Sequence, residues 1–185
     1  THIIDISTNL NQPVEIGFIS GSFSTHRDIK TYNNYIYIGT EANLGNPLLL
    51  PDWVVDPEGV QVVDISDPTN PVLVNEWTGI TQSHNLMTDD NGYLYVIGTN
   101  DLDDLNILDL SDPVNPEKVG GWSYYESPSS DGYLHDVCIH GDILYGCGIY
   151  VDRIYAIDIS DKTNPYLIDS WDGVPFSHAC WVSGD

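Results

Sequence analysis

Short apolar runs separated by polar turn residues make up most of the chain. Runs rich in Val, Ile, Leu and Tyr occur at 35–38, 93–96 and 143–145, and Gly, Pro, Asn and Asp bound them. Apolar or alternating runs of about four to eight residues between such turn residues are typical of β-strands. No segment carries a sustained helical period, so the pattern predicts an all-β fold.

One phrase recurs along the chain, in which two apolar residues precede Asp, an apolar residue and Ser. Its full copies at 62–71, 107–116 and 156–165 continue through a second Asp to Asn-Pro, and a weaker copy begins at Ile3. The first Asp of the phrase stands at positions 5, 64, 109 and 158, so 45 and 49 residues separate the last three. A period of about 20–50 residues indicates a solenoid, a propeller or another repeat array.

Each unit also contains a His, a Tyr-containing run and a Trp. The Trp residues at 77, 122 and 171 each follow the repeated Asp by 13 positions. Four extended runs in a unit of this length describe a propeller blade. We therefore predict a β-propeller of about four four-stranded blades, partial at both ends, as a single domain over residues 1–185. Residues 41–58 form an insertion, and the partial ends suggest a piece of a larger propeller.

The turn residues assign the loops to two faces. Asn91-Gly92 and Gly141-Asp142 favour two-residue hairpins, and the Asp-Pro-x-Asn-Pro phrase favours a tight turn between two strands. If the first strand of a blade begins at its His, these short turns lie on one face, called the lower face here. The His residues and the longer, irregular loops then share the upper face, where function usually lies.

The phrase at 62–71 with its following Trp77 resembles the LVIVD repeat. The segments Ser83-His84-Asn85, Leu134-His135-Asp136 and Ser177-His178 resemble the choice-of-anchor B family. That resemblance implies a bacterial or archaeal propeller at the cell surface or secreted, and it implies no settled activity. The insertion at 41–58 departs from the family pattern, and no sorting domain is present in the sequence.

The net charge restricts the partners. Acidic residues number 28 and basic residues 5, which gives a formal net charge of −23. Such a chain lacks the Lys and Arg that bind phosphate backbones or anionic membranes, so nucleic acid is excluded as a partner. No apolar run is long enough for a transmembrane helix, which needs about 18 residues or more.

One His per blade forms the first candidate site: His26, His84, His135 and His178. Four imidazoles around the mouth of a central channel could hold a transition metal such as iron, as in an oxidase-like metalloenzyme. The alternative is structural, because a residue repeated in every blade is usually a structural device, here a hydrogen bond from His to a neighbouring Asp or Ser.

An acidic loop forms the second candidate site, with Asp101, Asp103 and Asp104 as calcium ligands. Clustered carboxylates suit a hard cation, although the spacing is not that of an EF-hand. A solvated acidic loop is the alternative.

Apolar and aromatic residues in upper-face loops form a candidate partner site: Leu49, Trp53, Tyr124 and Tyr125. Exposed apolar loops mark interaction surfaces, and adjacent Tyr residues suit stacking on sugars. The alternative is that the insertion folds down and covers a blade.

Three cysteines are present, so at least one has no intramolecular partner. Cys138 and Cys147 flank one predicted hairpin and resemble the Cys pair of the choice-of-anchor B family. An exported protein would permit a disulfide between them if the strand register agrees, and Cys180 would then be free.

No Ser-His-Asp spacing, phosphate-binding loop or nucleotide fingerprint occurs. We therefore expect a non-enzymatic extracellular propeller that binds a protein or glycan partner through its upper face. Two alternatives stay open, which are a metalloenzyme using the His set and a surface-layer or filament subunit stabilised by calcium.

Overall fold

The computed structural model describes residues 1–7, 10–21, 24, 26–41, 59–99, 103–124 and 132–183. Four residues of the predicted sites, Leu49, Trp53, Asp101 and Tyr125, lie outside these ranges, as does most of the insertion at 41–58. Within the described ranges the regular elements are strands, and no helix is present.

Three four-stranded antiparallel sheets and one two-stranded sheet form the fold. Each four-stranded sheet is a meander whose strands pair in chain order.

The N-terminal pair is β1 (His2–Asp5) and β2 (Val14–Phe18). The first blade has β3 (Ile29–Tyr32), β4 (Tyr35–Ile38), β5 (Val60–Asp64) and β6 (Val72–Trp77). The second blade has β7 (Asn85–Thr88), β8 (Tyr93–Ile97), β9 (Leu105–Asp109) and β10 (Glu117–Trp122). The third blade has β11 (Asp136–His140), β12 (Ile143–Gly148), β13 (Arg153–Asp158) and β14 (Tyr166–Asp172).

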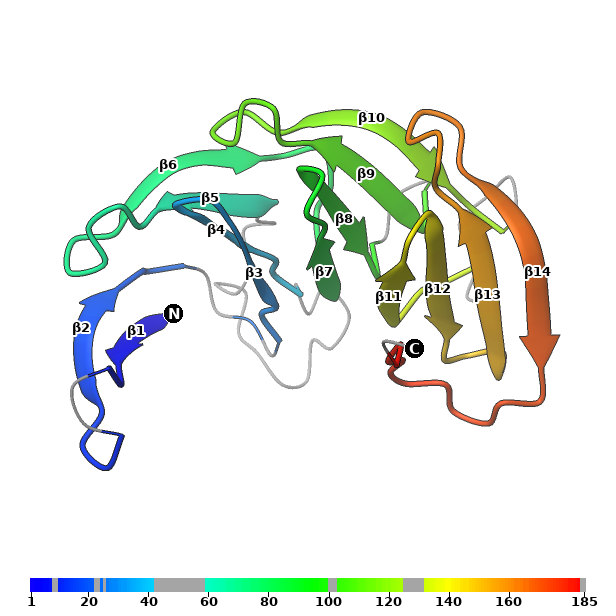
Figure 1. Cartoon of the computed structure of the whole chain (residues 1–185), viewed down its shortest axis with the longest axis horizontal. Helices are drawn as coiled ribbons and strands as arrows, with labels where there is room; N and C mark the ends of the chain where they lie inside the picture. Colours follow the sequence, from blue (N-terminus) through cyan, green and yellow to red (C-terminus); the bar gives the residue numbers. More distant parts are fainter. Residues whose placement is uncertain are drawn as a thin grey trace, which may run out of the picture.

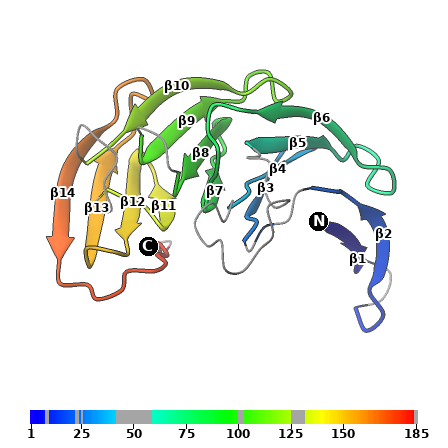
Figure 2. The same cartoon turned by 180° about the vertical axis from the view of Figure 1, so that it is seen from behind.

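The blades stand side by side along an arc (Figures 1 and 2). Strands β3, β7 and β11 line the concave side, and β6, β10 and β14 follow the convex rim. The chain after β14 returns to the concave side beside β11 (Figure 1). The partial C-terminal blade, expected from His178 onwards, is not formed, because residues 173–183 carry no strand. The arrangement agrees with the predicted blades, of which three are complete and the N-terminal one is partial.

The predicted two-residue hairpin is present at Gly141-Asp142, where Gly141 has a φ of +59°, and Asn33 takes the equivalent place in the first blade with a φ of +52°. The two-residue hairpin predicted at Asn91-Gly92 is wrong: β7 ends at Thr88 and β8 begins at Tyr93, so residues 89–92 form a longer loop, in which Gly92 has a φ of +85°. Gly and Asn tolerate this left-handed region better than other residues, which explains their choice here.

A β-bulge occurs between the last two strands of all four sheets. The register shifts at Ile3/Ile4, Val62/Val63, Lys118/Gly120 and Ala156/Ile157. A bulge leaves one residue of the outer strand unpaired and increases its twist, so the outer strand curves along the convex rim.

The repeated Asp residues act as turn caps, as their phrase predicts. Asp64 accepts a hydrogen bond from the amide of Ser66 at 2.7 Å, and Asp67 accepts one from the amide of Thr69 at 3.0 Å. Equivalent bonds recur at the other two full copies of the phrase. Many of the excess acidic residues are therefore Asp side chains that accept hydrogen bonds within turns.

The same turns also hold neighbouring blades together, which the sequence did not indicate. The hydroxyl of Tyr37 in the first blade donates to the carbonyl of Pro113 in the second at 2.9 Å. Asn75 donates from Nδ2 to the carbonyl of Val114 at 2.7 Å. Gly120 in β10 packs so close to the third blade that a Cβ there would lie 1.9 Å from the carbonyl oxygen of Lys162.

The core lies between blades and not only within them. One cluster joins the first two blades and includes Tyr37, Val62, Leu86 and Leu94, and a second joins the last two. Burial of these apolar faces supplies the main stabilisation of stacked blades.

Candidate functional site

The candidate site lies at the beginning of the innermost strands, where the polar residues of adjacent blades meet. Strands β3 and β11 both contact β7, which lies between them. Each of these strands follows a His-containing segment, so the topology brings one imidazole from each blade to the same place. The C-terminal segment adds a fourth, from His178.

The four imidazoles form a continuous row. Ring centroids are 4.5 Å apart between His26 and His84, 4.1 Å between His84 and His135, and 4.1 Å between His135 and His178. The first pair is stacked at 14°, and the other two are tilted by 50° and 47°. We call these four residues the His row. The end members are exposed and the two central members are half-buried.

The central histidines have further partners. Nδ1 of His84 lies 3.2 Å from Oε2 of Glu41, an ion-pair distance, although the pair lacks the geometry of a regular hydrogen bond. Interaction with His84 lowers the pKa of the Glu41 carboxyl. Nδ1 of His135 lies 2.8 Å from the carbonyl oxygen of His178. Burial, followed by the charge of His84, lowers the pKa of His135, so the neutral ring is favoured.

Glycine permits the close packing of this row. A Cβ at Gly98 would lie 2.3 Å from the Cβ of His84, and the φ of Gly98 is +63°. A larger residue would therefore push the imidazole of His84 out of place.

All four members of the His row line one cavity of about 230 Å³, together with Asn85, Asp136 and Ala179. A neighbouring cavity of about 380 Å³ has apolar walls from Leu86, Met87, Val137, Ile139 and Trp181, and its polar lining includes Lys30, Asp136, Cys138 and Cys180. Asn85 and Asp136 border both cavities.

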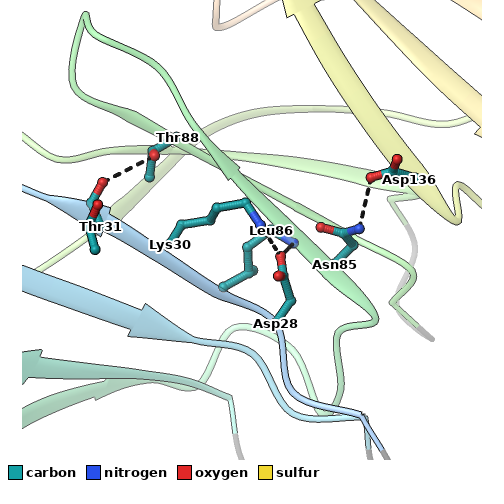
Figure 3. A network of polar contacts seen from close by, with 7 residues as sticks. All are labelled: Asp28, Lys30, Thr31, Asn85, Leu86, Thr88 and Asp136. Atoms are coloured by element: carbon teal, nitrogen blue, oxygen red, sulfur yellow. Dashed lines mark hydrogen bonds and ion pairs between the residues drawn. The ribbon is translucent and has the colours of Figure 1, made fainter. Parts of the chain in front are cut away.

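Polar residues that follow the histidines tie the blades together (Figure 3). Oδ2 of Asp28 accepts a hydrogen bond from the amide of Leu86 at 2.7 Å and pairs with Nζ of Lys30 at 2.5 Å. Nδ2 of Asn85 donates to Oδ1 of Asp136 at 2.8 Å. The amide of Cys180 donates to the other carboxylate oxygen of Asp136 at 3.1 Å.

The hydrogen bonds between blades that were predicted for the histidines are therefore made mainly by the polar residues that follow them in the sequence. The signal for this was present, because a polar residue follows the His by one or two positions in His26-x-Asp28, His84-Asn85 and His135-Asp136. Its target could not be predicted, because the bonds connect residues more than 40 positions apart.

The three thiols meet on one face of the third blade. All three are free in the structure. The register pairs Cys138 with Tyr145 and Cys147 with Asp136, so the two predicted disulfide partners are diagonal neighbours and not directly opposed. Hydrogen bonding with Cys147, burial, and hydrogen bonding with Cys138 raise the pKa of the Cys180 thiol. The bond between Cys138 and Cys147 stays a prediction.

The described members of the acidic loop have protein partners. Asp103 pairs with Nζ of Lys118 at 2.5 Å. Asp104 is buried, and its Oδ2 accepts a hydrogen bond from the amide of Tyr124 at 3.1 Å. Burial raises the pKa of Asp104 to about 6.

Tyr124 itself packs against other side chains of the blades. Its ring centroid is 5.2 Å from that of Tyr155, and the guanidinium carbon of Arg153 lies 5.1 Å from the ring. The predicted partner site, of which Tyr124 is the one described member, stays a prediction.

Among the described residues, no group of three or more His, Cys, Asp or Glu side chains is placed to hold a metal ion. The predicted transition metal at the His row and calcium at the acidic loop both stay predictions. The described part of the chain also contains no helix long and apolar enough to cross a membrane.

Comparison with protein families finds a match to the model of the LVIVD repeat at residues 53–78, 90–122 and 131–173. These stretches together cover more than half of the chain. No curated protein matches.

Solved structures with the same fold include two designed proteins and one natural protein. The computationally designed Ika8 protein has a TM-score of 0.60 at 15% identity, over 91% of this chain and 43% of that chain. For the computationally designed Ika4 protein the TM-score is 0.62 at 14% identity, over 92% of this chain and 87% of that chain. A protein from Lactobacillus plantarum gives a TM-score of 0.66 at 13% identity, over 93% of this chain and 48% of that chain. This chain therefore spans less than half the length of Ika8 and of the Lactobacillus protein, and the likeness concerns the fold.

Proposed function

The chain belongs to the LVIVD-repeat family, and we propose that it is a β-propeller binding module that holds a glycan in the cavity lined by the His row. The observation that carries this proposal is the convergence of all four imidazoles with Asn85 and Asp136 on one cavity of about 230 Å³. Binding sites are typically concave, with a few converging polar groups that fix the ligand's orientation.

The chemistry of the cavity favours a hydroxyl-rich ligand. Neutral imidazole has one nitrogen that donates and one that accepts a hydrogen bond, so it can pair with hydroxyl groups in either sense. The net charge of −23 disfavours acidic ligands, so a neutral sugar is preferred over a sulfated or phosphorylated one.

We further propose that the protein acts outside the cell, at the surface or secreted, as a member of the choice-of-anchor B group. Support for this comes from the segments around His84, His135 and His178 that resemble that group. A protein partner at the same face is the other occupant to consider, and a binding screen distinguishes the two.

The test is a glycan array followed by titration of the bound glycans in solution. We expect His84→Ala to weaken binding by about tenfold or more, because loss of about 1.4 kcal/mol changes Kd tenfold. His140→Ala is the matched control, since His140 is the exposed last residue of β11 and lies outside the His row. Failure to bind any glycan, or equal binding by both variants, would refute the proposal.

A transition metal at the His row is the second candidate function, since imidazole is a ligand for zinc, copper, iron and nickel. The observation that supports it is that all four imidazoles line the same cavity. Elemental analysis of natively purified protein decides this candidate. If none of these metals is present at close to one ion per protein chain, the metal-site hypothesis is refuted.

A further inference from the structure

The three cysteines converge on one face of the third blade. Side chains alternate along a strand, and the register of β11 with β12 pairs Cys138 with Tyr145 and Asp136 with Cys147. Asp136, Cys138, Tyr145 and Cys147 therefore all point from the same face of the hairpin. Cys147 is fully buried, and Cys138 is half-buried.

Cys180 reaches this face from the C-terminal segment. Its amide donates to Oδ2 of Asp136 at 3.1 Å, and its Sγ lies 3.4 Å from the carbonyl oxygen of Tyr145. Interaction with the thiols of Cys147 and Cys138, together with burial, raises the pKa of the Cys180 thiol, as expected where the three groups lie close together. A residue from beyond β14 thus lies over the two thiols of the hairpin.

We propose that Cys147 and Cys180 form a disulfide that fastens the C-terminal segment to the third blade. The pair joins β12 to a segment without strand pairing, which hydrogen bonds from Val174, Phe176 and Ser177 also connect to the third blade. The bond would keep His178, two residues before Cys180, at the end of the His row. The proposal does not depend on glycan binding by that row.

The register argues against the alternative within the hairpin. Diagonal neighbours on antiparallel strands are separated by about 7–8 Å. A disulfide needs Cα atoms within about 4.4–6.8 Å of each other and Cβ atoms within about 4.5 Å. Cys138 and Cys147 would have to shift the register of β11 to pair, whereas Cys180 lies on a segment without ladder bonds.

Access to the thiols sets the order of the reaction. The cavity of about 380 Å³ is lined by Cys180 and Cys138 but not by Cys147. A small disulfide such as oxidised glutathione can therefore reach Cys180 and Cys138 before Cys147, and we propose Cys180 as the thiol that reacts. Because its pKa is raised, Cys180 must first lose its proton, which makes this step slow near neutral pH. The resulting thiolate attacks one sulfur of the oxidant, one glutathione leaves and takes up a proton to become a thiol, and a mixed disulfide with Cys180 remains.

The second step completes the bond. The Cys147 thiolate attacks Sγ of Cys180 and expels the second glutathione as a thiol. Two protein thiols are oxidised and one glutathione disulfide is reduced to two thiols, so electrons and protons balance.

Peptide mapping tests the pairing directly, because trypsin cleavage at basic residues places Cys180 in a different peptide from Cys138 and Cys147. Trypsin cleaves after Lys118, Arg153 and Lys162, so Cys138 and Cys147 fall in the peptide 119–153 and Cys180 falls in 163–185. The 185-residue chain is equilibrated with oxidised glutathione, its remaining thiols are alkylated, and the digest is analysed by mass spectrometry without reduction. We expect these two peptides to be linked and the number of free thiols to fall from three to one, with Cys138 alkylated.

Two variants make the assignment specific. Cys138→Ser should still give the linked peptides, and Cys180→Ser should leave both remaining thiols free. Cleavage before Asp142 separates Cys138 from Cys147 and so distinguishes their bonds with Cys180. A bond within 119–153, a bond between Cys138 and Cys180, or three alkylated thiols would each overturn the proposal.

Discussion

Asn85 in β7 donates a hydrogen bond from Nδ2 to Oδ1 of Asp136 in β11, with 2.8 Å between the two atoms. This bond crosses from the second blade to the third, and the other oxygen of the same carboxylate accepts from the amide of Cys180. One carboxylate therefore connects three consecutive segments of the concave side.

Asp136→Ala should destabilise the protein by about 1.5–3 kcal/mol, because hydrogen bonds to charged groups contribute that much. Chemical denaturation measures the change in the free energy of unfolding. Glu117→Ala, at an exposed site on β10, removes one carboxylate without a seam contact and should change stability by less than about 0.5 kcal/mol. Equal effects of the two variants would contradict the role of Asp136.

Asp28→Ala should cost about 1–3 kcal/mol, because it leaves the amide of the buried Leu86 without its 2.7 Å partner. Lys30→Ala removes the other partner of Asp28, a partly exposed ion pair, and should cost less than about 1 kcal/mol. Asp28→Asn retains an acceptor and should fall between the two. The prediction fails if Lys30→Ala is the more damaging change in urea denaturation.

Gly120→Ala should destabilise the protein by about 1–3 kcal/mol, the usual range for overpacking. Its Cβ would meet the carbonyl oxygen of Lys162 in the next blade at 1.9 Å, and a backbone group cannot move aside as a flexible side chain can. Thermal unfolding measures the loss, with Glu117→Ala on the same strand as the control. A neutral result would mean that the two blades separate at this point without loss of stability.

Acidification should weaken the Asp turn caps. Hydrogen bonding from the side chain and then the amide of Thr163 lowers the pKa of Asp161 below its ordinary value of 3.8. A carboxyl with a depressed folded-state pKa contributes stability above its unfolded pKa and loses it as pH falls through the folded value. Asp161→Asn should therefore reduce stability at pH 7 and flatten the decline below about pH 4.

Urea denaturation between pH 7 and pH 3 follows that decline. Asp90→Asn, in the exposed hairpin of the second blade, is the matched control for loss of one carboxylate. The same pH profile in both variants would show that the cap at Asp161 does not contribute to it.

Features that depend on neighbouring residues were predictable. The hairpin at Gly141-Asp142 and the caps at Asp64 and Asp67 follow from the conformational range of Gly and from hydrogen bonds two residues apart. The regular spacing of the Trp and Asp positions likewise identified the blades. Placement of one His at the start of each innermost strand followed from the same repeat.

For the candidate site, the sequence predicted which residues take part but not how they are arranged. The sequence indicated four histidines on one face, but the stacking of His26 on His84 depends on how neighbouring blades pack. The seam bonds of Asp28 and Asn85 join residues 58 and 51 positions apart, so no local pattern identifies their partners. Likewise, the register of β11 with β12 decided which thiols are neighbours.

By itself, the sequence determined an all-β chain of repeated four-stranded units, because strand and turn preferences act over a few residues and recur with the repeat. Only the tertiary structure decided which surfaces of adjacent blades meet. That depends on the packing of Tyr37, Leu86 and Gly120 against residues of the next blade or the previous one. The His row and the position of Cys180 over the third blade follow from this packing, because both bring together residues from different blades.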